Sequence, residues 1–185
     1  MSNLPAYTLF FAILSLIAAA LSVSTVLSML LDKSDSLQIR RTLAPLSLEI
    51  AAGVAITSLA GSLFLSEYLN FTPCLLCWVQ RGFMYPAAIL LGVQVVRSNR
   101  SKEYKKPILA YVATVLALFG LPVAIFHRWE QASGSDLSYC DPVAPCSAKW
   151  MNEFGFITIP TMAGIGFFSI SVFVLLHIKS RSKIS

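Results

Sequence analysis

The sequence predicts an all-α fold, a polytopic membrane bundle of transmembrane helices. The chain has 185 residues, of which 56% are hydrophobic and 12% are charged. Its mean hydropathy of +0.72 is typical of proteins that cross a membrane several times. Five apolar stretches have roughly the 20 residues that a helix needs to cross the hydrocarbon core. Helices are expected because lipid cannot satisfy exposed backbone polar groups.

The five expected helices occupy approximately residues 5–31, 43–65, 75–96, 107–126 and 157–178. No basic segment precedes the first stretch, which is also longer than the apolar part of a usual signal peptide. Cleavage after Ala18-Ala19-Ala20 would leave Arg40 and Arg41 outside the cell. We therefore expect a retained helix.

Basic residues predict the orientation of these helices. Alternate connecting segments carry most of them: three lie in 32–42, five in 97–106 and three in the C-terminal tail, out of 14 in the chain. The positive-inside rule then puts the N-terminus outside and the C-terminus in the cytosol. All four cysteines fall on the extracytoplasmic side, where disulfides persist. The charge distribution therefore favours a plasma-membrane protein over a nucleic-acid binder.

The first cysteine pair lies where the third apolar stretch begins. Thr72 and Pro73 are typical of a helix start, so Cys74 and Cys77 are expected one turn apart on the same face. The N-terminal end of a helix favours thiolate, the reactive form of cysteine. Arg81, one turn deeper, can stabilise a thiolate or a carbonyl oxygen that gains charge. A structural disulfide or half of a zinc site remains an alternative, although we expect no metal site.

The second pair, Cys140 and Cys146, lies in the longest polar connection and encloses Pro142 and Pro145. A stiff, exposed bridge of this kind is open to attack by an external thiolate. The alternative is a structural staple of the loop. Together the two pairs predict a relay in which an external dithiol reduces the loop pair, and the loop pair reduces Cys74–Cys77. A lipid-soluble quinone is the expected final acceptor, because it takes two electrons and two protons.

Two separate motifs carry a resemblance to a known family. They are the stretch Gly61 to Glu67 followed by Pro73-Cys74-Leu75-Leu76-Cys77-Trp78-Val79-Gln80-Arg81 and Met84-Tyr85-Pro86, and the stretch Pro145-Cys146-Ser147 followed by Phe154 to Pro160. Over roughly residues 50–180 the chain resembles the disulfide bond formation protein B (DsbB) family, in particular its short, BdbC-like branch.

The resemblance implies a four-helix oxidoreductase of the bacterial cytoplasmic membrane. Such a protein takes electrons from a thioredoxin-fold thiol oxidase (DsbA- or BdbD-like) and passes them to ubiquinone or menaquinone. By position, Cys74 and Cys77 match the quinone-facing pair, and Cys140 and Cys146 match the pair that exchanges with the oxidase. Arg81 and Cys77 match the quinone site, to which His127 and Trp78 are added as further candidates. Residues 1–42 would then be an extra N-terminal helix and cytosolic loop, and 43–185 the family domain.

Two other functions remain open. A quinone oxidoreductase similar to vitamin K epoxide reductase would have its loop cysteines before the membrane-level pair, the reverse of the order here. A non-enzymatic scaffold would use both pairs as inert disulfides. Separately, Gly53, Thr57 and Gly61 recur every four residues and predict close helix packing. Trp78 and Tyr85 are also candidates for an aromatic belt at the membrane surface.

Overall fold

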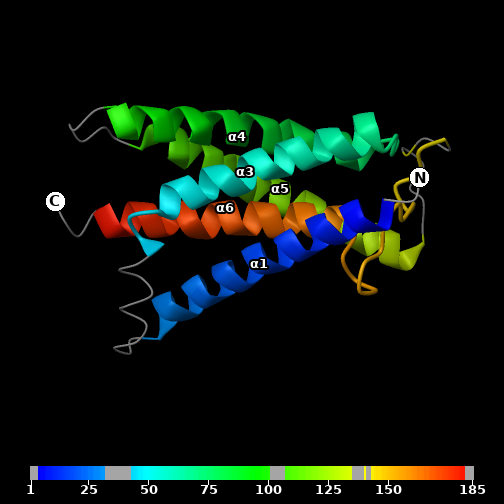
Figure 1. Ribbon diagram of the computed structural model, residues 1–185, viewed down its shortest axis with the longest axis horizontal. Helices are drawn as coiled ribbons and strands as arrows, with labels where there is room; N and C mark the ends of the chain where they lie inside the picture. The colour runs from blue at the N-terminus through cyan, green and yellow to red at the C-terminus, as the bar shows by residue number, and fades with distance from the viewer. Residues whose placement is uncertain (1–3, 32–42, 101–106, 135–139, 141–142, 182–185) are drawn as a thin grey trace.

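A computed structural model describes residues 4–31, 43–100, 107–134, 140 and 143–181 (Figure 1). The described chain is helical, with one isolated antiparallel bridge between Glu153 and Ile157. Five helices are long and apolar enough to cross a membrane, which confirms the predicted fold class. They are α1 (Leu4–Leu30), α3 (Ser47–Leu63) with its π-helical continuation η1 (Phe64–Tyr68), α4 (Leu75–Arg100), α5 (Ile108–Ser133) and α6 (Ile159–Arg181).

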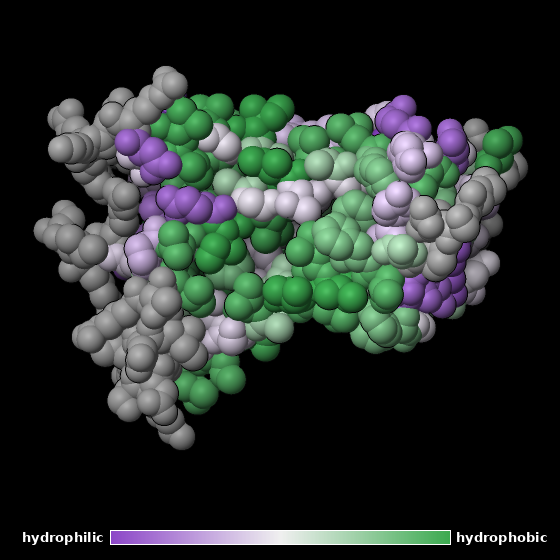
Figure 2. All heavy atoms as spheres, in the orientation of Figure 1, coloured by the Kyte–Doolittle hydropathy of each residue, from purple (hydrophilic) through white to green (hydrophobic). Residues whose placement is uncertain are grey.

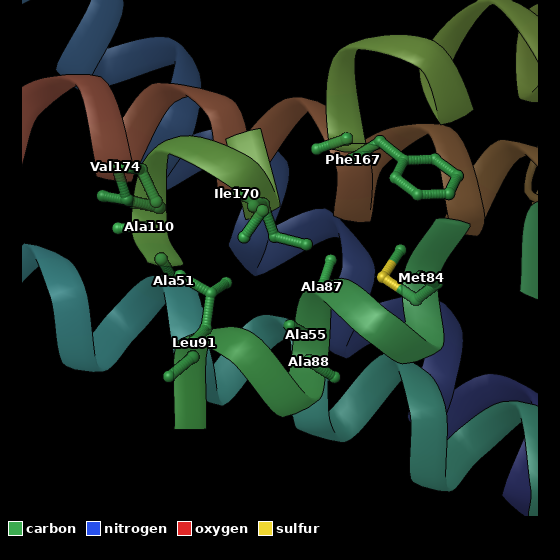
Figure 3. Close-up of a cluster of buried hydrophobic side chains, with 14 of the residues drawn as sticks. Ala51, Ala55, Met84, Ala87, Ala88, Leu91, Ala110, Phe167, Ile170 and Val174 are labelled. Atoms are coloured by element: carbon green, nitrogen blue, oxygen red, sulfur yellow. The ribbon is translucent and has the colours of Figure 1, made fainter. Parts of the chain in front are cut away.

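Helices α3, α4, α5 and α6 pack in a ring in which each contacts the next and α6 returns to α3. Small side chains fill the core between them and let the helices approach closely (Figure 3). Gly120 of α5 is the extreme case, because a Cβ there would overlap the buried ring of Phe167. The buried alanines of this core include Ala51, Ala55, Ala87, Ala88, Ala110 and Ala113.

Helix α1 lies outside this ring and packs mainly on α6 (Figure 1). Its buried face carries hydroxyl side chains, and the Oγ atoms of Ser22 and Ser169 lie 2.8 Å apart across the α1–α6 contact. Ser22 also donates to its own helix, at the carbonyl oxygen of Ala18. Large apolar side chains such as Phe10 and Val23 are more than half exposed, as expected for a lipid-facing surface.

The structure corrects the end of the fourth expected span. Helix α5 continues past Phe126 to Ser133 and ends at Gly134, which has a left-handed φ of 66° and caps the helix through its N–H to the Glu130 carbonyl. His127 is therefore helical, although the hydropathy pattern placed it in the following connection. The reason is that polar residues ended the apolar stretch but did not end the helix.

Both cysteine pairs and the start of α1 lie at one end of the bundle, and the C-terminal end of α6 lies at the other (Figure 1). Thr8 on α1 donates a 2.8 Å hydrogen bond to Oε1 of Glu153, which follows the cysteine loop. The visible face is hydrophobic in its middle and hydrophilic toward its ends (Figure 2). The basic segment 32–42 and residues 101–106 lie outside the described residues, so the side of the membrane that each end faces stays a prediction.

Candidate functional site

The first cysteine pair stands at the start of α4, as the Thr72-Pro73 pattern predicts. Cys74 immediately precedes the helix and Cys77 lies in its first turn, with their Sγ atoms 2.9 Å apart and both present as free thiols. The Cys77 backbone N–H donates to Cys74 Sγ at 3.3 Å. Cys74 is only 5% exposed. Two donors directed at one sulfur favour its thiolate form.

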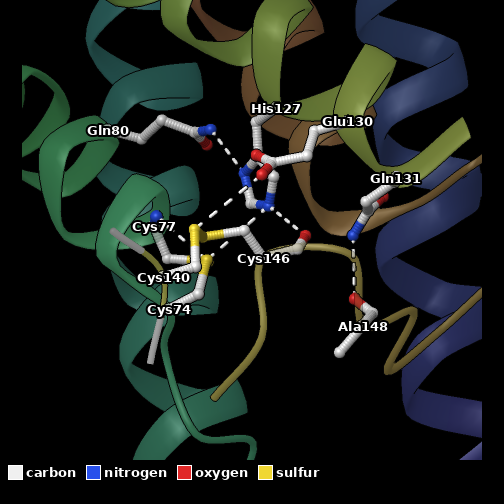
Figure 4. Close-up of a disulfide and its surroundings, with 9 residues drawn as sticks. All are labelled: Cys74, Cys77, Gln80, His127, Glu130, Gln131, Cys140, Cys146 and Ala148. Carbon is white, nitrogen blue, oxygen red and sulfur yellow. Dashed lines mark hydrogen bonds between the residues drawn. A yellow bond between two sulfur atoms is a disulfide. The ribbon is translucent and has the colours of Figure 1, made fainter. Parts of the chain in front are cut away.

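His127 lies on α5 directly beside this dithiol (Figure 4). Its Nε2 is 3.6 Å from Cys74 Sγ and 3.1 Å from the carbonyl oxygen of Cys146. Because a carbonyl oxygen only accepts, Nε2 carries the proton, and in a neutral ring Nδ1 accepts from the Gln80 amide at 2.9 Å. Gln80 thus fixes the tautomer that directs an N–H toward Cys74 and the cysteine loop.

Electrostatics at Cys74, which lies just outside the membrane-spanning part of α4, favour the reactive form. The hydrogen bond from the Cys77 thiol lowers the pKa of Cys74 well below its ordinary value. Burial opposes this effect, and the hydrogen bond from His127 adds to it. Cys74 is therefore disposed to be a thiolate.

Cys140 and Cys146 form a disulfide that packs against the dithiol. Cys146 is completely buried, and it shares one small cluster with Cys74 and Leu76, against which Cys77 and Cys140 also pack. Glu130, itself completely buried on α5, places Oε1 3.8 Å from Cys140 Sγ. One turn of α5 therefore contacts both cysteine pairs, through His127 and Glu130.

A cavity of about 370 Å³ opens on the other side of Cys77. Arg81 reaches it while donating from Nε to Ser62 Oγ at 2.9 Å and from Nη2 to the Ser62 carbonyl at 3.0 Å. The buried hydroxyl of Tyr85, a second lining residue, has no hydrogen-bond partner among the described residues. Most of the remaining lining is apolar and comes from α1, α3, α4 and α6.

The structure divides the predicted site residues into groups. Cys77 and Arg81 line the cavity, whereas His127 does not and lies between the two cysteine pairs. Trp78 is 58% exposed and is also absent from the lining; its ring lies 5.1 Å from the Arg81 guanidinium carbon.

Three residues at the site were not predicted as site residues: Gln80, Tyr85 and Glu130. Their spacing carries a signal, because Gln80 falls one turn after Cys77 and Glu130 one turn after His127. For Glu130 that signal appears only once the helical extension of α5 is known.

Cys74, Cys77 and His127 also form a set of metal-type ligands, with their ligand atoms within 4.8 Å of one another. A disulfide between Cys74 and Cys77 would remove both thiolates from that set. A metal and a redox cycle would therefore compete for the same atoms.

Fold and site together define a class: a multi-pass helical membrane protein in which a dithiol and a disulfide pack side by side at one end of the bundle. The chain belongs to the DsbB family, because the model of that family, "Disulfide bond formation protein DsbB", matches residues 45–177. The family places it among the membrane proteins of disulfide-bond formation, as a disulfide oxidoreductase.

Curated relatives agree with this assignment. "Disulfide bond formation protein C" of Bacillus subtilis is 39% identical over 133 residues, covering 70% of this chain and 91% of the relative. "Probable disulfide formation protein C 1" of Bacillus cereus is 37% identical over 132 residues, covering 71% and 91%. No solved structure gives a significant match.

Proposed function

We propose that this protein is a thiol:quinone oxidoreductase of the bacterial cytoplasmic membrane that reoxidises an extracytoplasmic, thioredoxin-fold thiol oxidase. The observation that carries the proposal is the position of Cys77, which packs with the Cys140–Cys146 disulfide on one side and lines an apolar cavity on the other. Electrons from a soluble partner could thus cross a few ångströms of protein to a lipid-soluble acceptor.

The first half of the cycle consists of two thiol–disulfide exchanges. A thiolate of the partner attacks Cys140–Cys146, and its second thiol resolves the mixed disulfide, so the partner is oxidised and the loop pair is reduced. A loop thiolate then attacks a Cys74–Cys77 disulfide and the second loop thiol resolves the mixed disulfide, so the loop pair is oxidised again and Cys74 and Cys77 are left as thiols. The described state, a Cys74–Cys77 dithiol beside a loop disulfide, corresponds to the end of this second exchange.

The second half of the cycle returns Cys74 and Cys77 to a disulfide with loss of two electrons and two protons. A bound quinone supplies the matching two-electron, two-proton acceptor chemistry. The cavity residues fit such a molecule: Arg81 and the unpartnered Tyr85 hydroxyl are donors for carbonyl oxygens, and the apolar walls suit a ring and tail. Trp78 would act on this site only by holding the Arg81 guanidinium.

The test is quinone reduction by purified protein in detergent, with a reduced thioredoxin-fold dithiol as donor and a panel of ubiquinone-type and menaquinone-type acceptors. We expect wild type to reduce at least one acceptor, as followed by quinone absorbance. Cys77→Ser should lower this rate to the background, because no disulfide can then re-form at the membrane-level pair. Val143→Ser, a change at an 83% exposed position of the cysteine loop, is the control for handling and folding.

Three results would contradict the proposal. Full activity of Cys77→Ser would exclude the relay. No reduction of any acceptor by wild type, with both disulfides resistant to the reduced partner, would favour the inert scaffold. Zinc that co-purifies with the reduced protein and is lost in Cys77→Ser would favour the metal site.

A further inference from the structure

Helix α1 forms one wall of the cavity beside Cys77. The lining residues of α1 recur at helical spacing over about 15 Å of the helix, so they belong to one face. They are Phe11, Leu14, Ser15, Ile17, Ala18 and Leu21. This helix precedes the residues matched by the family model, which begin at residue 45. The cavity wall is thus a feature that this chain adds to the family's four-helix core.

The opposite wall is the stripe of small residues on α3. Gly53 and Thr57, which the sequence predicts at a helix contact, instead line the cavity, and a Cβ at Gly53 would meet nothing within 4 Å. Only Gly61, nearer the cysteine end, has the predicted close contact: its Cβ position lies 3.0 Å from the Phe11 ring of α1. Helices α1 and α3 thus meet at that end, and the channel between them extends as far as Leu21 of α1 and Ile50 of α3.

The channel is polar at one end and apolar along its length. At the cysteine end its lining includes Cys77, Arg81 and Ser62, and farther along the helices it includes Leu21, Ile50 and Phe173. An occupant that matches this lining has a polar head near the dithiol and a long hydrocarbon tail. Without α1, the tail end of the channel would be an open groove on the lipid-facing side of α3 and α6.

We propose that α1 encloses the polyprenyl tail of the quinone, and so makes this protein discriminate quinones by their tails as well as by their rings. The inference rests on the proposed quinone reduction, and it adds that residues of α1 contact the tail. The tail would then contact protein, on the face of α1 that ends at Leu21, and would not lie in the lipid.

Photolabelling tests the contact without requiring turnover. A quinone with a photoreactive diazirine near the middle of its tail is bound to purified protein and irradiated, and the adducts are mapped by mass spectrometry. We expect adducts in the α1 peptide that contains Leu14 to Leu21, competed away by the unlabelled tailed quinone. Competed adducts confined to α3, α4 and α6 would overturn the inference.

Kinetics test the discrimination. Ala18→Phe fills the tail end of the channel, whereas Ala20→Phe puts the same ring on an exposed position of α1 outside the lining. With two acceptors that share one ring, we expect Ala18→Phe to raise the ratio of KM for the polyprenyl quinone to KM for the tailless quinone about tenfold. Ala20→Phe should leave that ratio unchanged.

A second pair of variants keeps the test decisive if Ala18→Phe fails to fold. Leu21→Ala removes a half-exposed wall residue and should raise the same KM ratio, while Leu27→Ala, outside the lining, should not. Unchanged ratios in both wall variants would overturn the inference. A wild type that reduces neither quinone defeats the proposed function instead, and photolabelling of α1 then reports separately whether a tail is bound.

Discussion

Cys74 is the residue on which most of the local interactions converge. It receives a hydrogen bond from Cys77, lies beside His127 and is nearly excluded from solvent. Its pKa is lowered first by the Cys77 thiol and then by His127. Because a lowered pKa keeps the thiolate populated at lower pH, Cys74 should remain nucleophilic under conditions where an ordinary cysteine is protonated.

The pH dependence of Cys74 alkylation tests this environment. In the reduced protein we expect iodoacetamide to modify Cys74 with a midpoint below that of a free thiol, and His127→Phe should move the midpoint to higher pH. His177→Phe, which replaces another buried histidine far along α6, is the matched control. Mass spectrometry of the Cys74 peptide gives the rate at each pH. A wild-type midpoint equal to that of free cysteine would contradict the assignment.

At the scale of one element, α5 combines two requirements. Its end near the cysteines presents His127 and Glu130, and its middle must approach α6 closely at Gly120. A Cβ at Gly120 would overlap the ring of Phe167, which is completely buried and cannot move into open space. The α5–α6 packing that supports the site therefore depends on a glycine about two turns before His127.

Gly120→Ala should lower the free energy of unfolding by about 1–3 kcal/mol, the usual cost of overpacking a core. Gly82→Ala is the matched control, since its Cβ would meet nothing within 4 Å and alanine favours a helix. Thermal unfolding of both variants in one detergent gives the comparison. Equal unfolding midpoints for the two variants would show that the Phe167 ring can move aside for a Cβ at position 120.

At the scale of the whole molecule, the cysteine loop lies at one end of the bundle and the C-terminal end of α4 lies at the other (Figure 1). We propose, from the basic segments, that the cysteine end is extracytoplasmic. In a chain with its four native cysteines replaced by serine, Val143→Cys should react with a membrane-impermeant maleimide on intact cells. Arg97→Cys, near the other end of α4, should react only after lysis. The reverse labelling pattern would invert the proposed orientation.

How much the sequence could predict depended on the kind of signal. Hydropathy alone was sufficient for the five helices, since each apolar stretch has the length that a bilayer requires. The Thr72-Pro73 pattern and the spacing of the cysteines correctly placed Cys74 at the start of α4, with Cys77 and Arg81 on its first two turns. His127 was misplaced in a loop because polar side chains that face a protein interior are indistinguishable, by hydropathy, from those that face water.

Relations between distant helices could not be predicted. The stripe Gly53, Thr57 and Gly61 indicated a face of α3, but a sequence does not tell whether such a face meets a helix along its whole length or opens onto a cavity. The same limit hid the buried hydroxyl of Tyr85 and the contact of Phe11 with Gly61. Both are set by how helices distant in the sequence pack against one another.

The alanine-rich core has a consequence for the movement of charge across the membrane. The buried side chains of the cluster that extends from Met84 to Leu48 are all apolar, so none of them can carry a proton from Cys74 or Cys77 along the bundle. In the proposed cycle, electrons and protons would enter and leave near the same membrane surface, and no net charge would cross the bilayer. We expect quinone reduction in proteoliposomes to proceed at the same rate with and without an imposed voltage. A rate that follows the voltage would reveal a charge-transfer path through the bundle, and disulfide formation would then draw on the membrane potential as well as on the quinone.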